Sequence, residues 1–268
     1  MSDSAALGVA IGAGREADVY PRGETAVLKL YRPGFGGHHT EALALRALED
    51  SGVAPKLLDV VEFDGRVGLL VERLSGPDLL TLLQRRPWRV GSIARVLARA
   101  QLDIHRVQAP LGLADLRTTL AERIVAADLP RQLFDFVARV LDNLPGGDRL
   151  CHGDYHPGNV LLVGGRSAVI DWGAATRGAP EADHARTLLL LRWADPLPDT
   201  PPLTKALIAS GRSLLATAYA RAYRRGSTPL RHTSSWLVVH AAARLSEGIP
   251  SERKLLIRRL EDAQRRAR

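Results

Sequence analysis

Short apolar runs separated by turn residues fill the first quarter of the chain, and they predict β-strands. Two of these runs, at 17–20 and 26–31, are joined by the turn sequence PRGE. Two more, within 56–74, flank the dipeptide Asp64-Gly65, which is a strong signal for a tight hairpin turn. The pattern therefore predicts a small antiparallel sheet at the start of the chain.

One helix is predicted between the two pairs of strands. Apolar residues at 42, 45 and 48 share one helical face, with Thr40 as a suitable N-cap and Gly52 as a stop signal. The glycine-containing stretch PGFGGHH before Thr40 is expected to form a loop.

From about residue 75 onward the spacing of apolar residues changes to that of helices. The repeat is clearest over 90–108, 131–144 and 183–194, and the proline-rich stretch 195–202 is expected to be a loop. We therefore predict an α+β fold of two lobes: a small β-rich lobe with one helix (1–74) and a larger, mostly helical lobe (75–268). A cleft between two lobes is a common place for a ligand.

The segment LCHGDYHPGNVLLVGGRSAVIDWG, residues 150–173, interrupts the helical pattern with a predicted two-stranded ribbon. Gly164 and Gly165 suit a tight turn, because glycine adopts positive φ without strain. This turn places Asn159 opposite Ile170, so Asn159 and Asp171 come to the same end of the ribbon, with Asp154 on the entering loop. Neighbouring strands place facing residues about 5 Å apart, and side-chain oxygens on such residues suit one or two Mg²⁺ ions. A third carboxylate is then free to act on a hydroxyl.

The sequence IGAGREADVY precedes the second predicted strand and indicates a phosphate-binding turn. Gly12 and Gly14 allow close approach of the backbone, and Ala17 stands where a kinase glycine loop has its third glycine. Lys29 lies inside the next strand, where it is either a solvated surface residue or a phosphate anchor, and Glu41 is a suitable partner for it. A strand follows the glycines and no Gly-Lys-Ser/Thr occurs, so neither a dinucleotide fingerprint nor a Walker A loop is present.

Composition narrows the class of protein. The chain has 268 residues, a net charge of +8 and a single cysteine, so an intrachain disulfide is excluded. The basic residues are scattered and not interleaved with aromatic ones, so no nucleic-acid partner is expected. No apolar run reaches the length of a membrane span. We expect a cytoplasmic protein without a membrane partner; its oligomeric state is not readable.

Taken in order, these motifs resemble the aminoglycoside phosphotransferase and choline-kinase-like enzymes, which share the protein-kinase-like fold. The resemblance covers residues 8–175, about two-thirds of the chain. Its most specific parts are HGDYHPGN and IDWG, and its least specific part is the glycine loop. The other matching pieces are VLK, TEALALRALEDSGVAP, LLVERLSG and LARAQLDIHRV.

The resemblance implies a role for each candidate residue and implies ATP and Mg²⁺ as cofactors. Asp154 would orient and deprotonate the acceptor hydroxyl, and Asp183 would brace its loop. Asn159 and Asp171 would bind Mg²⁺, and the backbone of residues 72–74, from Glu72 to Leu74, would bind adenine. The phosphates would be bound by Gly12, Gly14, Ala17 and Lys29, with Glu41 holding Lys29 in place.

Three functions remain open at this point. The first is a kinase that phosphorylates a hydroxyl of a small molecule such as an aminoglycoside, an amino alcohol or a sugar-like acceptor. The second is a small atypical protein kinase, and the sequence APE at 179–181 fits it, but only five residues separate that motif from Gly173, too few for an activation loop. The third is a nucleotide-binding pseudokinase, which the presence of all four motif residues (Lys29, Asp154, Asn159 and Asp171) disfavours.

Overall fold

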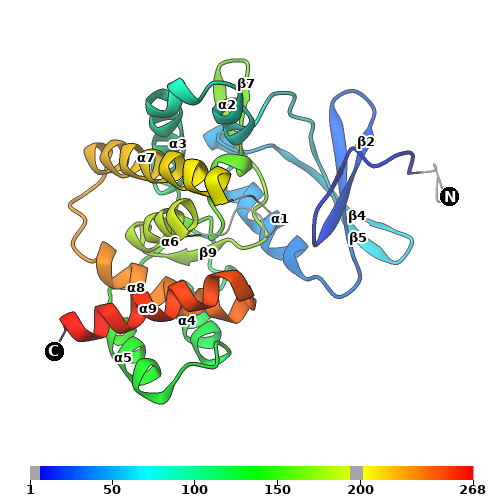
Figure 1. Ribbon diagram of the computed structural model, residues 1–268. Helices are drawn as coiled ribbons and strands as arrows, with labels where there is room; N and C mark the ends of the chain where they lie inside the picture. The colour runs from blue at the N-terminus through cyan, green and yellow to red at the C-terminus, as the bar shows by residue number, and fades with distance from the viewer. Residues whose placement is uncertain (1–6, 194–201, 268) are drawn as a thin grey trace.

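The computed structural model describes residues 7–193 and 202–267. Its first part is a five-stranded antiparallel sheet in the order β1-β2-β3-β5-β4 (Figure 1). The strands are β1 (Gly12–Ala13), β2 (Ala17–Arg22), β3 (Ala26–Tyr31), β4 (Leu57–Phe63) and β5 (Arg66–Glu72). The first turn lies one to two residues later than PRGE indicated, because Pro21 and Arg22 pair with β3 as the end of β2. At the predicted hairpin, Asp64 and Gly65 both have positive φ, which fits a tight turn.

The single helix of this lobe, α1 (Gly37–Ala47), begins earlier than the sequence indicated. Gly36 is its N-cap, so the prediction of Thr40 as the cap was wrong, and His38 to Thr40 form the first turn instead of a loop. Glu41 consequently lies in the second turn of the helix, where it is buried. A short 3₁₀ turn, η1 (Glu49–Ser51), follows and ends at Gly52, whose φ of 64° takes the chain out of helical geometry.

The second part is mostly helical and lies on the other side of the ribbon diagram from the sheet (Figure 1). Its helices are α2 (Leu79–Arg85), η2 (Pro87–Arg89), α3 (Val90–Ile104), α4 (Leu116–Val125), α5 (Arg131–Asp142), η3 (Pro157–Asn159), α6 (Pro180–Trp193), α7 (Pro202–Gly226), α8 (Thr233–Arg244), η4 (Leu245–Glu247) and α9 (Pro250–Arg266). Among these, α2 and α4 were not expected from the sequence. The predicted loop at 195–202 falls almost entirely outside the described residues.

Two apolar clusters organise the lobes. One joins the sheet and α1 to α3 and α7, with fully buried Leu69, Leu97 and Tyr219 among its members. The other lies among α4, α5, α6, α8 and α9, around the fully buried Trp236. The first cluster crosses the division between the lobes, so burial of apolar surface fixes the sheet against the helices.

Two small two-stranded sheets lie outside the main sheet. The ribbon pairs β7 (Val160–Val163) with β8 (Arg166–Val169) in the predicted register, and both turn glycines have positive φ. The other sheet pairs β6 (Arg149–Cys151) with β9 (Thr176–Gly178). The ribbon also contacts both lobes through its backbone: the Val169 amide donates to the Val53 carbonyl (2.7 Å) and the Leu162 amide to the Pro77 carbonyl (2.9 Å).

The buried histidine His240 gives the fold a pH dependence that can be measured. Its Nε2 lies 2.9 Å from the Ala182 carbonyl oxygen, and burial, assisted by Arg186, lowers its pKa from 6.5 to about 3. Below pH 6.5 the unfolded chain binds a proton that the folded chain does not bind until about pH 3. This contribution to stability is therefore complete above pH 6.5 and is lost as the pH falls.

We expect the free energy of unfolding to drop by about 2–3 kcal/mol from this residue between pH 7 and pH 4.5. His240→Gln keeps a donor for the carbonyl but cannot titrate, so its urea midpoint should depend less on pH. His39→Gln, at an exposed position on α1, is the matched control. Equal pH dependence of the His240→Gln and wild-type proteins would contradict the assignment.

Candidate active site

The open end of the ribbon brings Asn159 and Asp171 together. The Ile170 amide donates to the Asn159 carbonyl (3.0 Å), which fixes the two chain segments side by side. Asp171 follows directly with a φ of 67°, a left-handed conformation that is uncommon for residues other than glycine. Strained backbone of this kind is concentrated at functional sites. The carboxylate of Asp171 is accessible, because 54% of this side chain is exposed.

The loop that carries Asp154 is fixed by backbone hydrogen bonds to its neighbours. The Asn159 side-chain amide donates to the Asp154 carbonyl (3.0 Å), and the Asp154 amide donates to His152 Nδ1 (3.2 Å). His152 Nε2 in turn lies 3.0 Å from the Ile170 carbonyl oxygen. His152 is fully buried and holds the loop to the ribbon, while the Asp154 side chain stays 40% exposed. The backbone is thus held and the carboxylate is left accessible.

Asp183 of α6 holds the same loop from the other side. Its carboxylate accepts hydrogen bonds from the Gly153 amide (2.8 Å) and from Gln101 (2.9 Å), and it pairs with His105 Nε2 (3.0 Å). Burial alone would raise the pKa of Asp183, but these donors, His105 first, hold it well below 3.8. A buried carboxylate with three donors is a rigid anchor for the residue next to Asp154.

Gly153 is required where it stands. Its φ is 79°, and a Cβ at this position would lie 2.3 Å from the Ala174 carbonyl oxygen. The glycine in HGD therefore serves close packing of the loop against the segment that follows Asp171.

Lys29 of β3 connects the two lobes at the site. Its Nζ lies 2.6 Å from Glu41 on α1 and 2.8 Å from Asp171 on the ribbon. Burial lowers the pKa of this ammonium, but Glu41 and then Asp171 outweigh that effect and raise it. Lys29 is therefore charged, and of the two roles that the sequence left open the solvated surface lysine is excluded.

Tyr31 is a residue of this site that the sequence analysis missed. Its hydroxyl hydrogen-bonds to the same Glu41 carboxylate oxygen as Lys29. Burial, followed by the charge of Glu41, raises the pKa of the phenol, so it stays protonated as a donor. A signal was present in the sequence, because residues two apart on a strand share a face.

The glycine turn joins β1 to β2. Gly12 pairs with Val19, and the Gly14 amide donates to the Ala17 carbonyl (2.9 Å), which closes a tight β1–β2 turn. Ala17 is buried in the core of the small lobe, so only its backbone is available to a ligand. Glu16 at the tip points inward: a Cβ built on Gly37 would lie 3.0 Å from its carboxylate, and one on Gly173 3.6 Å. The turn thus approaches the DWG motif.

The connector after β5 is held by backbone contacts to both lobes. The amide of Glu72 donates to the Lys56 carbonyl (2.9 Å) and that of Arg73 to the Thr25 carbonyl (2.8 Å). Gly76 lies so close to the ribbon that a Cβ there would meet the Leu162 carbonyl oxygen at 2.2 Å. Of the expected adenine contacts, the Glu72 amide is already bonded, whereas Leu74 lies in an irregular stretch of the connector.

The donor set at the ribbon end suits a hard divalent cation that also binds phosphate. Asp171 offers a partly exposed carboxylate. The amide nitrogen of Asn159 donates to Asp154, and within the described part of the chain its side-chain oxygen accepts no hydrogen bond. Over the residues that the structure describes, no group of three or more His, Cys, Asp or Glu side chains could hold a metal. Mg²⁺ is usually bound by one or two protein oxygens, with phosphate oxygens and water completing its coordination shell. The two oxygens at the ribbon end fit this arrangement better than a structural site made of protein ligands alone.

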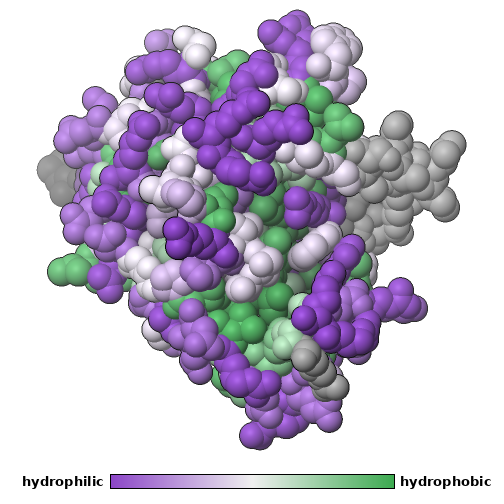
Figure 2. Space-filling view, turned by 90° about the vertical axis from the view of Figure 1, so that its left-hand side faces the viewer, coloured by the Kyte–Doolittle hydropathy of each residue, from purple (hydrophilic) through white to green (hydrophobic). Residues whose placement is uncertain are grey.

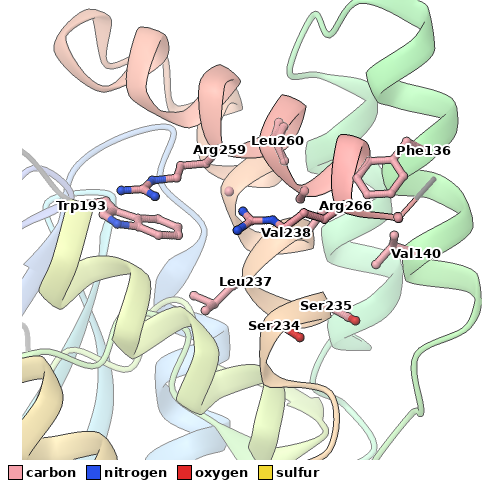
Figure 3. A pocket seen from close by; sticks show the side chains of 13 residues that line it. Phe136, Val140, Trp193, Ser234, Ser235, Leu237, Val238, Arg259, Leu260 and Arg266 are labelled. Atoms are coloured by element: carbon pink, nitrogen blue, oxygen red, sulfur yellow. The ribbon is translucent and has the colours of Figure 1, made fainter.

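A separate groove of about 560 Å³ is lined by residues of α5, α6, α8 and α9 (Figure 3). Its walls are mostly apolar, with Arg259 lying 5.4 Å above the ring of Trp193. The face of the molecule in Figure 2 shows apolar surface exposed among hydrophilic side chains. None of the expected site residues lines this groove, so it is not part of the site at the ribbon.

Comparison with known proteins decides the family. The family model described as "Phosphotransferase enzyme family" matches residues 8–255, which is most of the chain. The chain belongs to this family. The enzyme class expected from the sequence, a phosphotransferase, is confirmed. A search of curated proteins found no match.

Solved structures confirm the protein-kinase-like fold of this phosphotransferase. An aminoglycoside phosphotransferase in ternary complex with AMP-PNP and hygromycin B aligns over 95% of this chain and 91% of its own, at 16% identity and a TM-score of 0.66. An amicoumacin kinase in complex with AMP-PNP and Ca²⁺ aligns over 93% and 86%, at 15% identity and 0.65. A choline/ethanolamine kinase family protein from Mesorhizobium loti aligns over 94% and 85%, at 17% identity and 0.62. Within the described residues, no helix has the length and apolar character to cross a membrane.

The anchoring role of Asp183 can be tested by Asp183→Asn, which keeps the shape but removes the charge. We expect a loss of about 2–4 kcal/mol in the free energy of unfolding, because His105 and Gln101 lose a buried charged acceptor. The partly exposed α5 residue Asp135, paired with Arg131, provides the control Asp135→Asn, which should cost less than about 1 kcal/mol. Urea unfolding measures both, and similar losses for the two variants would refute the anchor.

Proposed function

We propose that this phosphotransferase moves the γ-phosphate of ATP to a hydroxyl of a small molecule, with Mg²⁺ as the metal. The observation that carries the proposal is the ion pair between Lys29 and Asp171, 142 residues apart, at 2.8 Å. It sets a fixed cation from the small lobe against the proposed metal ligand of the ribbon. Phosphoryl transfer needs such positioned charges more than it needs covalent chemistry.

Each lobe has its own proposed role. Residues 1–74 would bind the nucleotide, and residues 75–268 would carry the catalytic loop, the metal site and the acceptor site. Backbone amides of the turn from Gly12 through Gly14 to Ala17 would cover the phosphates, and Lys29, held by Glu41, would bind them. The connector from Glu72 to Leu74 would receive adenine, chiefly through the backbone of Leu74. ATP is a cytoplasmic metabolite, and we place the reaction in the cytoplasm.

Asp154 is the proposed catalytic residue. Its exposed carboxylate would accept the proton of the acceptor hydroxyl and orient the oxygen for in-line attack. Asn159 and Asp171 would hold Mg²⁺, which supplies charge neutralisation on the transferred phosphate when bound. The nearby His156, whose Nε2 lies 3.8 Å from Asp154, has a pKa lowered chiefly by burial, so near neutral pH it adds no fixed positive charge.

A small acceptor is favoured over a protein. β9 begins at Thr176, five residues after Asp171, and α6 follows at Pro180, so the segment has no room for an activation loop. The similar structures described above hold the small molecules hygromycin B and Ami beside a nucleotide analogue, which is consistent with this choice.

The role of Asp154 predicts the outcome of Asp154→Asn. We expect ATP consumption in the presence of an acceptor to fall by about 100-fold or more, because the base is lost, while ATP binding persists. Coupled detection of ADP measures the rate, and thermal shift with ATP measures binding. Asp148→Asn, at a half-exposed residue just before β6, is the control. Unchanged consumption by Asp154→Asn would overturn the assignment.

The metal site predicts a distinct change for Asn159→Ala. Activity should be lost on chelation by EDTA and restored by Mg²⁺, and the variant should need about tenfold more Mg²⁺ for half-maximal rate. The same variant frees the Asp154 loop, so stability is compared in parallel. A metal requirement that is identical in both proteins would remove Asn159 from the proposed ligand set.

A further inference from the structure

The groove near the C-terminus has the size and the composition of a small-molecule site. Thirteen residues on or next to α5, α6, α8 and α9 line its volume of about 560 Å³ (Figure 3). Pockets that bind small molecules enclose about 300–1,000 Å³ and combine mostly apolar walls with a few polar groups. Nine of the thirteen residues are apolar, and the other four are Ser234, Ser235, Arg259 and Arg266.

The apolar walls of the groove are preformed. Phe136 of α5 and Leu260 of α9 are buried members of the second apolar cluster, which fixes their positions. Trp193 at the end of α6 and Leu237 of α8 pack against the same cluster and stay partly exposed. A ligand that covers these side chains would remove apolar surface from water without rearranging the helices.

The charge in the groove has one sign. Arg259 and Arg266 are exposed on α9, and Figure 3 shows both side chains extending from this helix toward the groove. Among the described residues that line it there is no Asp or Glu. The groove therefore complements a negative charge, and a cationic ligand would meet only repulsion from its lining.

Arg259 is placed to receive that charge. Its guanidinium carbon lies 5.4 Å from the centre of the Trp193 ring, a cation–π contact that holds the cation over the apolar wall. Within the described part of the chain this guanidinium makes no hydrogen bond and no ion pair, so its N–H donors are open to solvent and to a ligand. Arg266 donates through Nε to the Asp262 carbonyl (3.2 Å), which leaves its two terminal nitrogens as further donors.

The extent of the groove favours a small molecule over a protein partner. A stable protein–protein interface takes about 20–30 residues from each side. The groove has thirteen, and they surround a hollow instead of forming a flat face. A compact ligand can cover most of these residues at once, whereas a partner protein would need a much larger surface.

We propose that this groove binds an amphipathic anion, a small molecule with an apolar body and one carboxylate. The body would pack against Trp193 and Phe136, and the carboxylate would pair with Arg259, with Arg266 as the second cation. A guanidinium binds a carboxylate through two parallel hydrogen bonds, which also orient the ligand. The proposal does not depend on the phosphotransfer function, because none of the residues proposed for that reaction lines the groove.

Four compounds separate the contribution of the body from that of the charge. Decanoate carries both, decanol lacks the charge, decyltrimethylammonium reverses it, and butanoate lacks the long body. By calorimetry below the micelle concentration, we expect decanoate to bind with a Kd under about 1 mM and at least about tenfold more tightly than each of the others. If decanoate fails to bind, or if any of the other three binds as tightly, the proposal is wrong.

Tryptophan fluorescence shows where the ligand binds. Of the four tryptophans, all within the described residues, Trp193 is the one that lines the groove. Decanoate should change the emission of the wild-type protein. Trp193→Phe keeps an aromatic wall, so it should lose this change and still bind decanoate in calorimetry. An emission change that persists in Trp193→Phe would place the ligand elsewhere and overturn the proposal.

Variants of Arg259 connect the binding to its cause. Arg259→Ala should raise the Kd for decanoate by about tenfold and leave the weak binding of decanol unchanged, and Arg259→Lys should recover part of the loss. Arg258→Ala removes the same charge from an exposed neighbour on α9 that does not line the groove, so it is the matched control. Thermal melting confirms that each variant is folded. Equal Kd values for Arg258→Ala and Arg259→Ala would indicate non-specific attraction to a protein of net charge +8 and would refute the site.

Discussion

The contact on which the site depends is the one that Lys29 makes to both Glu41 and Asp171. A charged ammonium in a partly buried position is costly unless carboxylates surround it, and here one carboxylate comes from each lobe. Asp171 makes this contact from a left-handed backbone conformation (φ 67°), which is strained for a residue other than glycine. Its pKa is depressed because the charge of Lys29 outweighs the effect of burial, so the carboxylate stays ionised where a metal would need it. The geometry of the cleft and the charge state of its residues therefore have the same origin.

Rigidity on the other side of the cleft comes from a different source, the packing of α6. Asp183 binds the Gly153 amide and Arg186, one turn further along, binds the Gly153 carbonyl. Both polar groups of the residue before Asp154 are therefore held by one helix. The helix is buried along most of its length, so its position is set by the apolar cores of the large lobe. The position of Asp154, the proposed base, therefore depends on how α6 packs in the apolar cores of the large lobe.

The sequence predicted the parts of the site that are local. Turn glycines at 164 and 165 determine the ribbon register, and thereby the proximity of Asn159 and Asp171, without any knowledge of the rest of the fold. The start of α1 was wrong because Gly36 caps the helix without a side-chain hydrogen bond, which leaves no signature in the sequence. Helix α4 was missed although Leu116, Leu120 and Ile124 recur at helical spacing, because polar residues separate them. The ion pair between Arg186 and Glu247 was out of reach of the sequence analysis, because the two residues are 61 positions apart in the chain.

That limit bears on what family membership explains. The residues proposed to bind nucleotide and metal lie on the small lobe and the ribbon, and the resemblance that implies their roles covers residues 8–175. That resemblance assigns no residue to the acceptor. Here the carboxylates of Glu247 and Glu252 are occupied by arginines, so their number alone says little about the charge that an acceptor meets. The charge that an acceptor meets has to be argued from contacts of this kind, residue by residue, because a carboxylate that is already paired with an arginine offers little to a cationic ligand.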